Sequence, residues 1–241
     1  DANTTANANT AIGFDAMSAN TTGTQNTALG ANALEYVQTG NDNTGLGYVA
    51  LMNAGGSQNT AIGSRALQDM TTGDDNTAVG YHALHTNTTA SNNTAVGSGA
   101  LYLNTTGASN TAVGYNSLDA NTSGNANVAV GKDTLSTNIS GASCVAIGND
   151  ALFANTASNN TAVGTSAMVA NTSGDAGVAV GKSALQANTE GRFLTGCGYE
   201  ALYSNTTGGY NTAVGQFALG ANTTASNNVG VGNNAGDSIT T

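Results

Sequence analysis

The sequence predicts an all-β fold in which the chain winds as a parallel β-solenoid of about 14 coils. One glycine recurs fourteen times, and eleven of the thirteen intervals between these glycines are 17 residues long, while two are 16. The segment before each glycine is a near copy of Asn-Thr-Ala-Val-Gly. A strict period this short is typical of stacked coils rather than of a globular core with a catalytic cleft. No shift in composition interrupts the period, so we expect one array over residues 1–241, a segment of a longer fibre or filament.

The strand of each coil is expected at the Asn-Thr-Ala-Val segment, whose residues are numbered here as positions 1 to 4. Position 2 is Thr or Val, position 3 is only Ala or Gly, and position 4 is Val, Ile or Leu with one Cys. Side chains alternate along a strand, so positions 2 and 4 share one face. We interpret that face as the inside of the coil, with Val79, Val96 and Val113 as its representatives. The small residues at position 3 then predict close packing on the other face, where a neighbouring chain would supply the cover.

The remainder of the coil is expected to turn and come back. The glycine at position 5, as in Gly80, Gly97 and Gly114, indicates a bend with positive φ or a close backbone approach. An Ala-Leu pair at positions 8 and 9 predicts a second short strand, with Leu84, Leu101 and Leu118 at its apolar position.

Asparagine at position 12 stays in phase from Asn87 to Asn222, and Asn87, Asn104 and Asn121 represent it. Stacked asparagines can form amide ladders along a solenoid, which would stiffen this corner. Asn20, Asn104 and Asn205 also begin Asn-x-Thr/Ser sequences, so glycosylation there is a hypothesis.

Composition excludes several kinds of partner. The chain has 14 acidic and 4 basic residues and a net charge of −10. It therefore lacks the basic surface that nucleic acids require, and an anionic membrane surface would repel it. No apolar run approaches the roughly 20 residues that span a bilayer, so we expect no membrane insertion by this segment.

Candidate chemical groups are scattered over different repeat positions, so we expect no enzyme, no cofactor and no metal. His82 and His85 share one coil and are interpreted as exposed surface residues rather than as a metal site. Two acidic pairs are the other candidates: Asp74 and Asp75 for weak calcium binding, and Asp133 and Asp150, both at position 7, for glycan hydrolysis.

The two cysteines lie three coils apart, which places them roughly 14 Å from one another at the spacing of stacked strands. A disulfide needs Cα atoms within about 7 Å, so we expect none. Cys197 replaces the valine of position 4 and is expected to be a small buried residue.

Aromatic residues recur at position 6, which is the first residue after the glycine. An exposed file of such rings could bind glycans or host receptors by stacking. The alternative is that the rings cover the edge of the coil or fill a seam between chains. The candidates for this file are Tyr48, Tyr81, Tyr115 and Tyr199.

The repeated Asn-Thr-Ala-Val-Gly, Asn-Thr-Ala-Ile-Gly and Val-Ala-Val-Gly segments resemble the head repeats of YadA-like trimeric autotransporter adhesins. The fuller unit, as in residues 211–219, is similar to repeats of phage-type tail-fibre proteins. The resemblance implies a left-handed parallel β-roll with three chains around a common axis. The 17-residue period departs from the adhesin heads, whose repeats are often shorter.

We therefore expect a non-enzymatic structural or adhesive protein, located outside the cell, at a cell surface or in a virion tail fibre. Its expected partners are itself, as a homotrimer or an end-to-end polymer, and a glycan or cell-surface receptor. The alternative is a monomeric ice-binding solenoid with flat rows of Thr from positions 2, 13 and 14. Valine at position 2 suggests inward packing and counts against this alternative, and the corner Thr rows are also interrupted near Thr39–Ser57 and Asn138–Ser158.

Overall fold

A computed structural model describes residues 5–240 of the chain. The chain forms two compact units, residues 1–124 and 125–241, and each is described by itself. The expected single array over residues 1–241 stays a prediction, and its residues 1–4 and 241 lie outside the described part.

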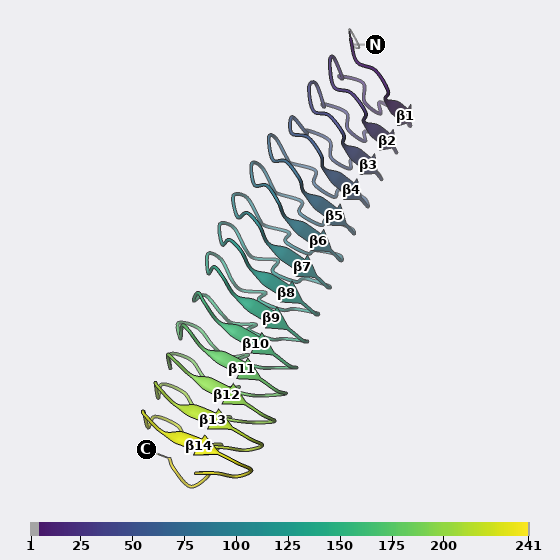
Figure 1. Cartoon of the computed structure of the whole chain (residues 1–241). Coiled ribbons are helices and arrows are strands. Elements are labelled where there is room, and N and C mark those ends of the chain that lie inside the picture. The colour runs from purple at the N-terminus through teal and green to yellow at the C-terminus, as the bar shows by residue number, and fades with distance from the viewer. Residues whose placement is uncertain (1–4, 241) are drawn as a thin grey trace. The chain divides into compact units, whose positions relative to one another are not determined.

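In the first unit, seven strands of three residues each pair in parallel and in chain order (Figure 1). The register is one whole repeat, so that Thr10 lies opposite Thr27 and Thr27 opposite Thr44. The strands are β1 (Thr10–Ile12), β2 (Thr27–Leu29), β3 (Thr44–Leu46), β4 (Thr60–Ile62), β5 (Thr77–Val79), β6 (Thr94–Val96) and β7 (Thr111–Val113).

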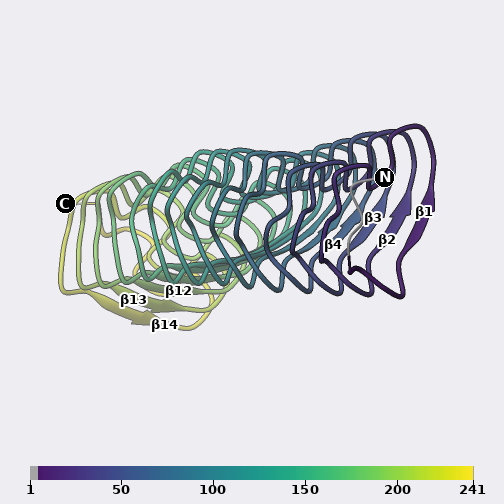
Figure 2. The same ribbon diagram turned by 90° about the horizontal axis from the view of Figure 1, so that it is seen from above.

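The second unit repeats this arrangement with seven further strands, which also pair in parallel and in chain order. Figure 2 shows the ends of the two strand series from above, with β1–β4 in purple and blue and β12–β14 in green to yellow. The strands are β8 (Val128–Val130), β9 (Val145–Ile147), β10 (Thr161–Val163), β11 (Val178–Val180), β12 (Thr195–Cys197), β13 (Thr212–Val214) and β14 (Val229–Val231).

Each unit is thus a parallel β-solenoid with one strand in every coil, which confirms the fold class and the repeat. Residues 5–240 contain no α-helix, and so no helix that could cross a membrane.

The prediction of which strand face lies inside is wrong. Position 3 is buried in every strand from β2 to β14, and Ala78, Ala95 and Ala112 have no exposed surface. Val79 and Val113 at position 4 are half-buried, and Val96 is 37% exposed. Positions 1 and 3 therefore point into the coil, while positions 2 and 4 point out of it.

The leucine at position 9 explains why position 3 stays small. Leu84, Leu101 and Leu118 are fully buried, so leucine supplies the bulk of the interior as expected. At Gly45, which takes position 3 in β3, an added Cβ would lie 2.8 Å from Leu34 Cδ1. The small side chain makes room for the chain's own leucine, and no second chain is needed to account for it.

The predicted second strand is also absent from the described residues, because the Ala-Leu segment is a run of turns. Residues at positions 7 and 9 both adopt positive φ, as in His82 at 57° and Leu84 at 50°. Their backbone groups bond to neighbouring coils: Leu84 N–H donates to Ala100 O at 3.0 Å, and His82 N–H donates to Ser64 O at 3.2 Å. These bonds hold leucine in a conformation that it ordinarily avoids.

The predicted amide ladder at position 12 is confirmed. Asn104 Nδ2 donates to Asn87 Oδ1 at 2.9 Å, and Asn121 Nδ2 donates to Asn104 Oδ1 at 2.8 Å. Position 1 carries a second file of buried asparagines, in which Asn93 N–H donates to Asn76 Oδ1 at 3.0 Å. Buried amides cost stability unless they are hydrogen-bonded, and the coil repeat supplies these partners.

Candidate functional site

The outward strand face is the first candidate surface, and it occurs in each unit. Position 2 contributes a file of Thr and Val, and position 4 contributes a file of Val, Ile and Leu with Cys197 in β12. Ile147 in β9 is 40% exposed and Val178 in β11 is 39% exposed. Apolar side chains thus lie in regular rows on a face that is exposed to solvent in the single chain.

This face carries no charged side chain at positions 2 or 4 of the fourteen strands in residues 5–240. The chain as a whole has a net charge of −10, so its charges lie on the turns and corners instead. A neutral, regular and partly apolar face inside an acidic surface is typical of an interaction surface.

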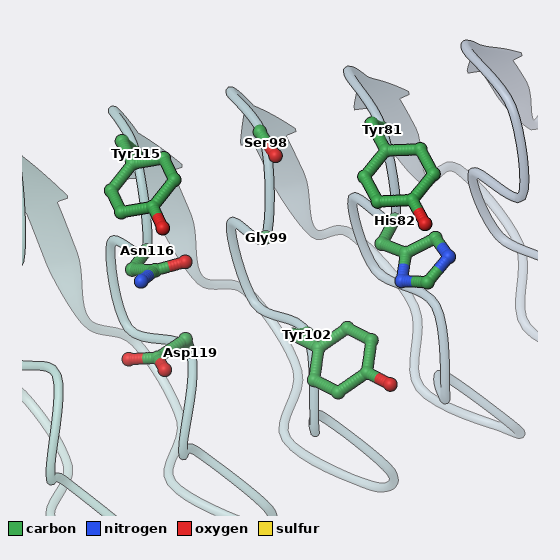
Figure 3. Close-up of a pocket in the computed structure, with 8 residues that line it drawn as sticks. All are labelled: Tyr81, His82, Ser98, Gly99, Tyr102, Tyr115, Asn116 and Asp119. Atoms are coloured by element: carbon green, nitrogen blue, oxygen red, sulfur yellow. The ribbon is translucent and has the colours of Figure 1, made fainter.

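A second candidate surface lies on the turns of the coils that hold β5, β6 and β7, and comprises a hollow of about 240 Å³ (Figure 3). Tyr81 and Tyr115, two of the predicted aromatics, stand at position 6 of the outer two coils and remain more than half exposed. Between them, the middle coil presents Ser98 and Gly99. The other lining residues are His82, Tyr102, Asn116 and Asp119.

Four rings form one aromatic cluster beside this hollow, in which three are stacked and that of His85 is tilted. The His82 ring lies 3.9 Å from the Tyr81 ring and 5.5 Å from the Tyr102 ring, with interplanar angles of 17° and 10°. The His85 ring lies 4.7 Å from the His82 ring. The two histidines are therefore half-buried members of an aromatic cluster, not the exposed surface residues that we expected.

The environment of both histidines favours their neutral form. Burial lowers the pKa of His82, and the charges of His85 and Arg65 lower it further. Burial also lowers the pKa of His85, although the Asp69 carboxylate opposes this effect. His85 Nδ1 lies 3.6 Å from Asp69 Oδ2, which is too long for a hydrogen bond, so the carboxylate acts through charge alone.

We expect acid to destabilise this cluster. Because the folded-state pKa values lie below the ordinary value of 6.5, the unfolded chain takes up protons first, and stability falls as the pH drops below 6.5. Between pH 7.5 and 5 the unfolding midpoint of the wild type should fall by about 2–4 °C more than that of a His82→Gln/His85→Gln variant. Thermal unfolding followed by circular dichroism measures both. Equal falls in the two proteins would contradict this assignment.

The other predicted aromatics lie outside the hollow. Tyr48 is exposed on the coil of β3. In the second unit, Tyr199 packs edge-on against Phe217 at 5.4 Å, and Lys182 Nζ lies 5.9 Å from its ring centre. A hydrogen bond to Glu200 and the charge of that carboxylate raise the pKa of Tyr199. The four tyrosines thus do not act as one file, and only Tyr81 and Tyr115 share a site.

Three of the four side chains in the acidic pairs are engaged within the fold. Asp74 Oδ1 accepts from Ser57 N–H at 2.7 Å across neighbouring coils. Lys132 Nζ lies 2.8 Å from Asp133 Oδ2, and Asn149 Nδ2 donates to Asp150 Oδ2 at 2.6 Å. No cluster of three or more His, Cys, Asp or Glu that could hold a metal occurs among residues 5–240.

Both cysteines are free thiols, but they lie in opposite surroundings. Cys144 occupies position 1, where it is fully buried and where burial raises its pKa. Cys197 occupies position 4 and is exposed, so the prediction that it is buried is wrong for the same reason as for the valines.

The three asparagines of the glycosylation hypothesis are buried members of the position 12 file. Asn104 Nδ2 donates to Gly107 O and Asn205 Nδ2 donates to Gly208 O, at 2.9 and 3.0 Å. An amide that is buried and donating in this way is not accessible for modification in the folded chain.

No protein-family model matches the chain, and neither a curated protein nor a solved structure is significantly similar to it. The fold defines its class as a parallel β-solenoid repeat protein, and the function must be inferred from its surfaces.

Proposed function

We propose that this chain is a non-enzymatic structural and adhesive protein, which assembles through its outward strand face into a trimeric fibre or adhesin head outside the cell. The observation that carries the proposal is the uncharged row of Thr, Val, Ile and Leu, with one Cys, on that face of each unit. Short side chains in register allow close approach over the whole face, and burying them removes apolar area from water.

A second copy of the same chain is the partner that fits this face best. Both faces would be neutral, so the net charge of −10 per chain opposes association only from the distant turns and corners. Both would also share the same repeat spacing, so that every coil could meet a coil of the partner. Three copies around an axis is the arrangement that the resemblance to adhesin heads implies.

A charge on the face should prevent assembly. The wild type is expected near 70 kDa, three times the 23.5 kDa chain, whereas a Val96→Lys/Val113→Lys variant is expected near 23.5 kDa. Both valines reach the surface, so the lysines can stay solvated in the single chain but would be unpaired charges inside an interface, at a cost of several kcal/mol. Light scattering coupled to size exclusion over a concentration series measures the masses.

The matched control is Thr106→Lys, which places a lysine on an exposed corner of the same unit and should leave the assembly intact. A wild type that stays monomeric at all concentrations, or a double variant that keeps the wild-type mass, would contradict assembly through this face.

One observation favours a second candidate function, ice binding. Inward packing of position 2 was one of two objections to it, and the structure turns Thr27 and its equivalents outward. The corner threonines fit less well, because hydroxyls such as Thr105 Oγ1 donate to the carbonyl of the next coil at 3.0 Å. An ice-binding face must be free in solution, so thermal hysteresis from a monomer would favour this function over assembly.

A further inference from the structure

The hollow beside Gly99 is a departure from the repeat and not a regular feature of it. Gly99 is the only glycine at position 7 of the fourteen coils. Ser98 takes position 6, where the coils on either side carry Tyr81 and Tyr115. Two adjacent positions of one coil thus carry small side chains. The recess opens there, between the two tyrosines (Figure 3).

A coil two repeats earlier has a similar arrangement at position 6 but differs at positions 7 and 10. Ser64 also takes position 6 between two tyrosines, Tyr48 and Tyr81. That coil carries Arg65 at position 7 and Gln68 at position 10, whereas the coil of the hollow carries Gly99 and Tyr102. Gly99 and Tyr102 thus distinguish the coil of the hollow from this otherwise similar coil.

The rings of the hollow form an open platform. The planes of Tyr81 and Tyr102 lie within 17° and 10° of the His82 ring between them, so these rings lie nearly parallel. Figure 3 shows their faces turned to the same side, with Asn116 and Asp119 along the neighbouring coil. A cage for a quaternary ammonium needs rings that surround the cation, and parallel rings do not.

The polar groups point to a neutral, hydroxylated ligand. Ser98, Asn116 and Asp119 offer a hydroxyl, an amide and a carboxylate, which accept from and donate to sugar hydroxyls. None of the eight lining residues is Lys or Arg, and the chain is acidic, so an anionic glycan has no partner here. The volume of about 240 Å³ lies below the usual range of about 300–1,000 Å³ for drug-sized ligands, which limits the occupant to about one sugar ring.

We propose that the hollow lined by Tyr81, Ser98, Tyr102, Tyr115, Asn116 and Asp119 binds one neutral pyranose unit of a glycan. The C–H face of the sugar ring stacks on the tyrosine platform, since the electron-rich face of an aromatic ring attracts weakly positive hydrogens. Its hydroxyls bond to Asn116 and Asp119. This inference gives a ligand class to the adhesive function proposed above and rests on it in that respect.

The test uses saturation-transfer NMR on the full chain with the methyl glycosides of glucose, galactose, mannose and N-acetylglucosamine as probes. At least one should bind, with a Kd of about 1 mM, as expected for a small site. Ser98→Tyr should weaken that binding at least tenfold, because it fills the recess with the residue that position 6 already holds in both adjacent coils. Tyr102→Leu should also weaken it about tenfold through loss of the ring.

Thr165→Tyr is the matched control, because it places the same residue at position 6 of a coil in the other unit and should leave binding unchanged. Circular dichroism checks that each variant is folded. The proposal is overturned if no probe binds, if Ser98→Tyr binds as the wild type does, or if choline chloride competes more strongly than every glycoside. Native mass is measured separately. If no sugar binds but the protein is still a trimer, the sugar site is wrong and the proposed assembly is unaffected.

Discussion

Replacing Gly198 by Ala is expected to destabilise the second unit by more than about 3 kcal/mol. Gly198 closes β12 with φ at 140°, a region that residues with a side chain rarely adopt. An added Cβ would lie 2.4 Å from Gly215 O of the next coil. That atom belongs to the backbone of a stacked coil, so relief requires the coils to separate and their ladder bonds to break.

Urea unfolding followed by circular dichroism measures this loss. Gly209→Ala, in the same unit, is the control, because its added Cβ would come no closer than 3.3 Å to Arg192 O, and its expected change is below about 1 kcal/mol. Equal midpoints for the two variants would show that the glycine at position 5 is not needed for coil stacking.

Replacing Asn104 by Ala is expected to cost about 3 kcal/mol or more in the first unit, through lost hydrogen bonds and a buried cavity. Asn104 Nδ2 donates to Asn87 Oδ1 and Gly107 O, and its Oδ1 accepts from Asn121 Nδ2. Truncation leaves Asn87 Oδ1 buried without this donor. It also interrupts the row of position 12 asparagines between Asn87 and Asn121.

The same unfolding measurement applies here, with Thr106→Ala as a control whose exposed side chain should change stability by less than about 0.5 kcal/mol. An Asn104→Asp variant keeps the shape of the side chain but lacks the donor, and it should lose nearly as much. Wild-type stability in both Asn104 variants would mean that the ladder is incidental to the fold.

The repeat allowed the strands, their parallel pairing and the asparagine ladder to be predicted, because each depends only on period and residue type. Alternation defines two faces of a strand but not which of them is inside. The bulky valines suggested a core, whereas Leu84 and its equivalents already fill the coil and leave room only for Ala78 and Ala95. The turns were mistaken for a strand because leucine with positive φ has no sequence signal.

The two candidate surfaces differ in how far the sequence indicated them. Tyr81 and Tyr115 could be named as ligand candidates from their repeat position alone. The hollow between them depends on what is missing at Ser98 and Gly99 and on Tyr102 three residues further. Its sequence signal was present, since no other coil has glycine at position 7. A repeat pattern, however, is defined by the residues that coils share, and Gly99 is a single exception to it.

The central claim, that copies of the chain meet through the outward strand face, is tested most directly by its own cysteine. Cys197 lies on that face and is exposed in the single chain, whereas Cys144 is buried inside the coil. Maleimide labelling of the native protein at its assembled mass, read by intact-mass spectrometry, should leave both thiols unmodified. In the Val96→Lys/Val113→Lys variant Cys197 alone should react. Labelling of Cys197 at the same rate in the assembled wild type would contradict the claim.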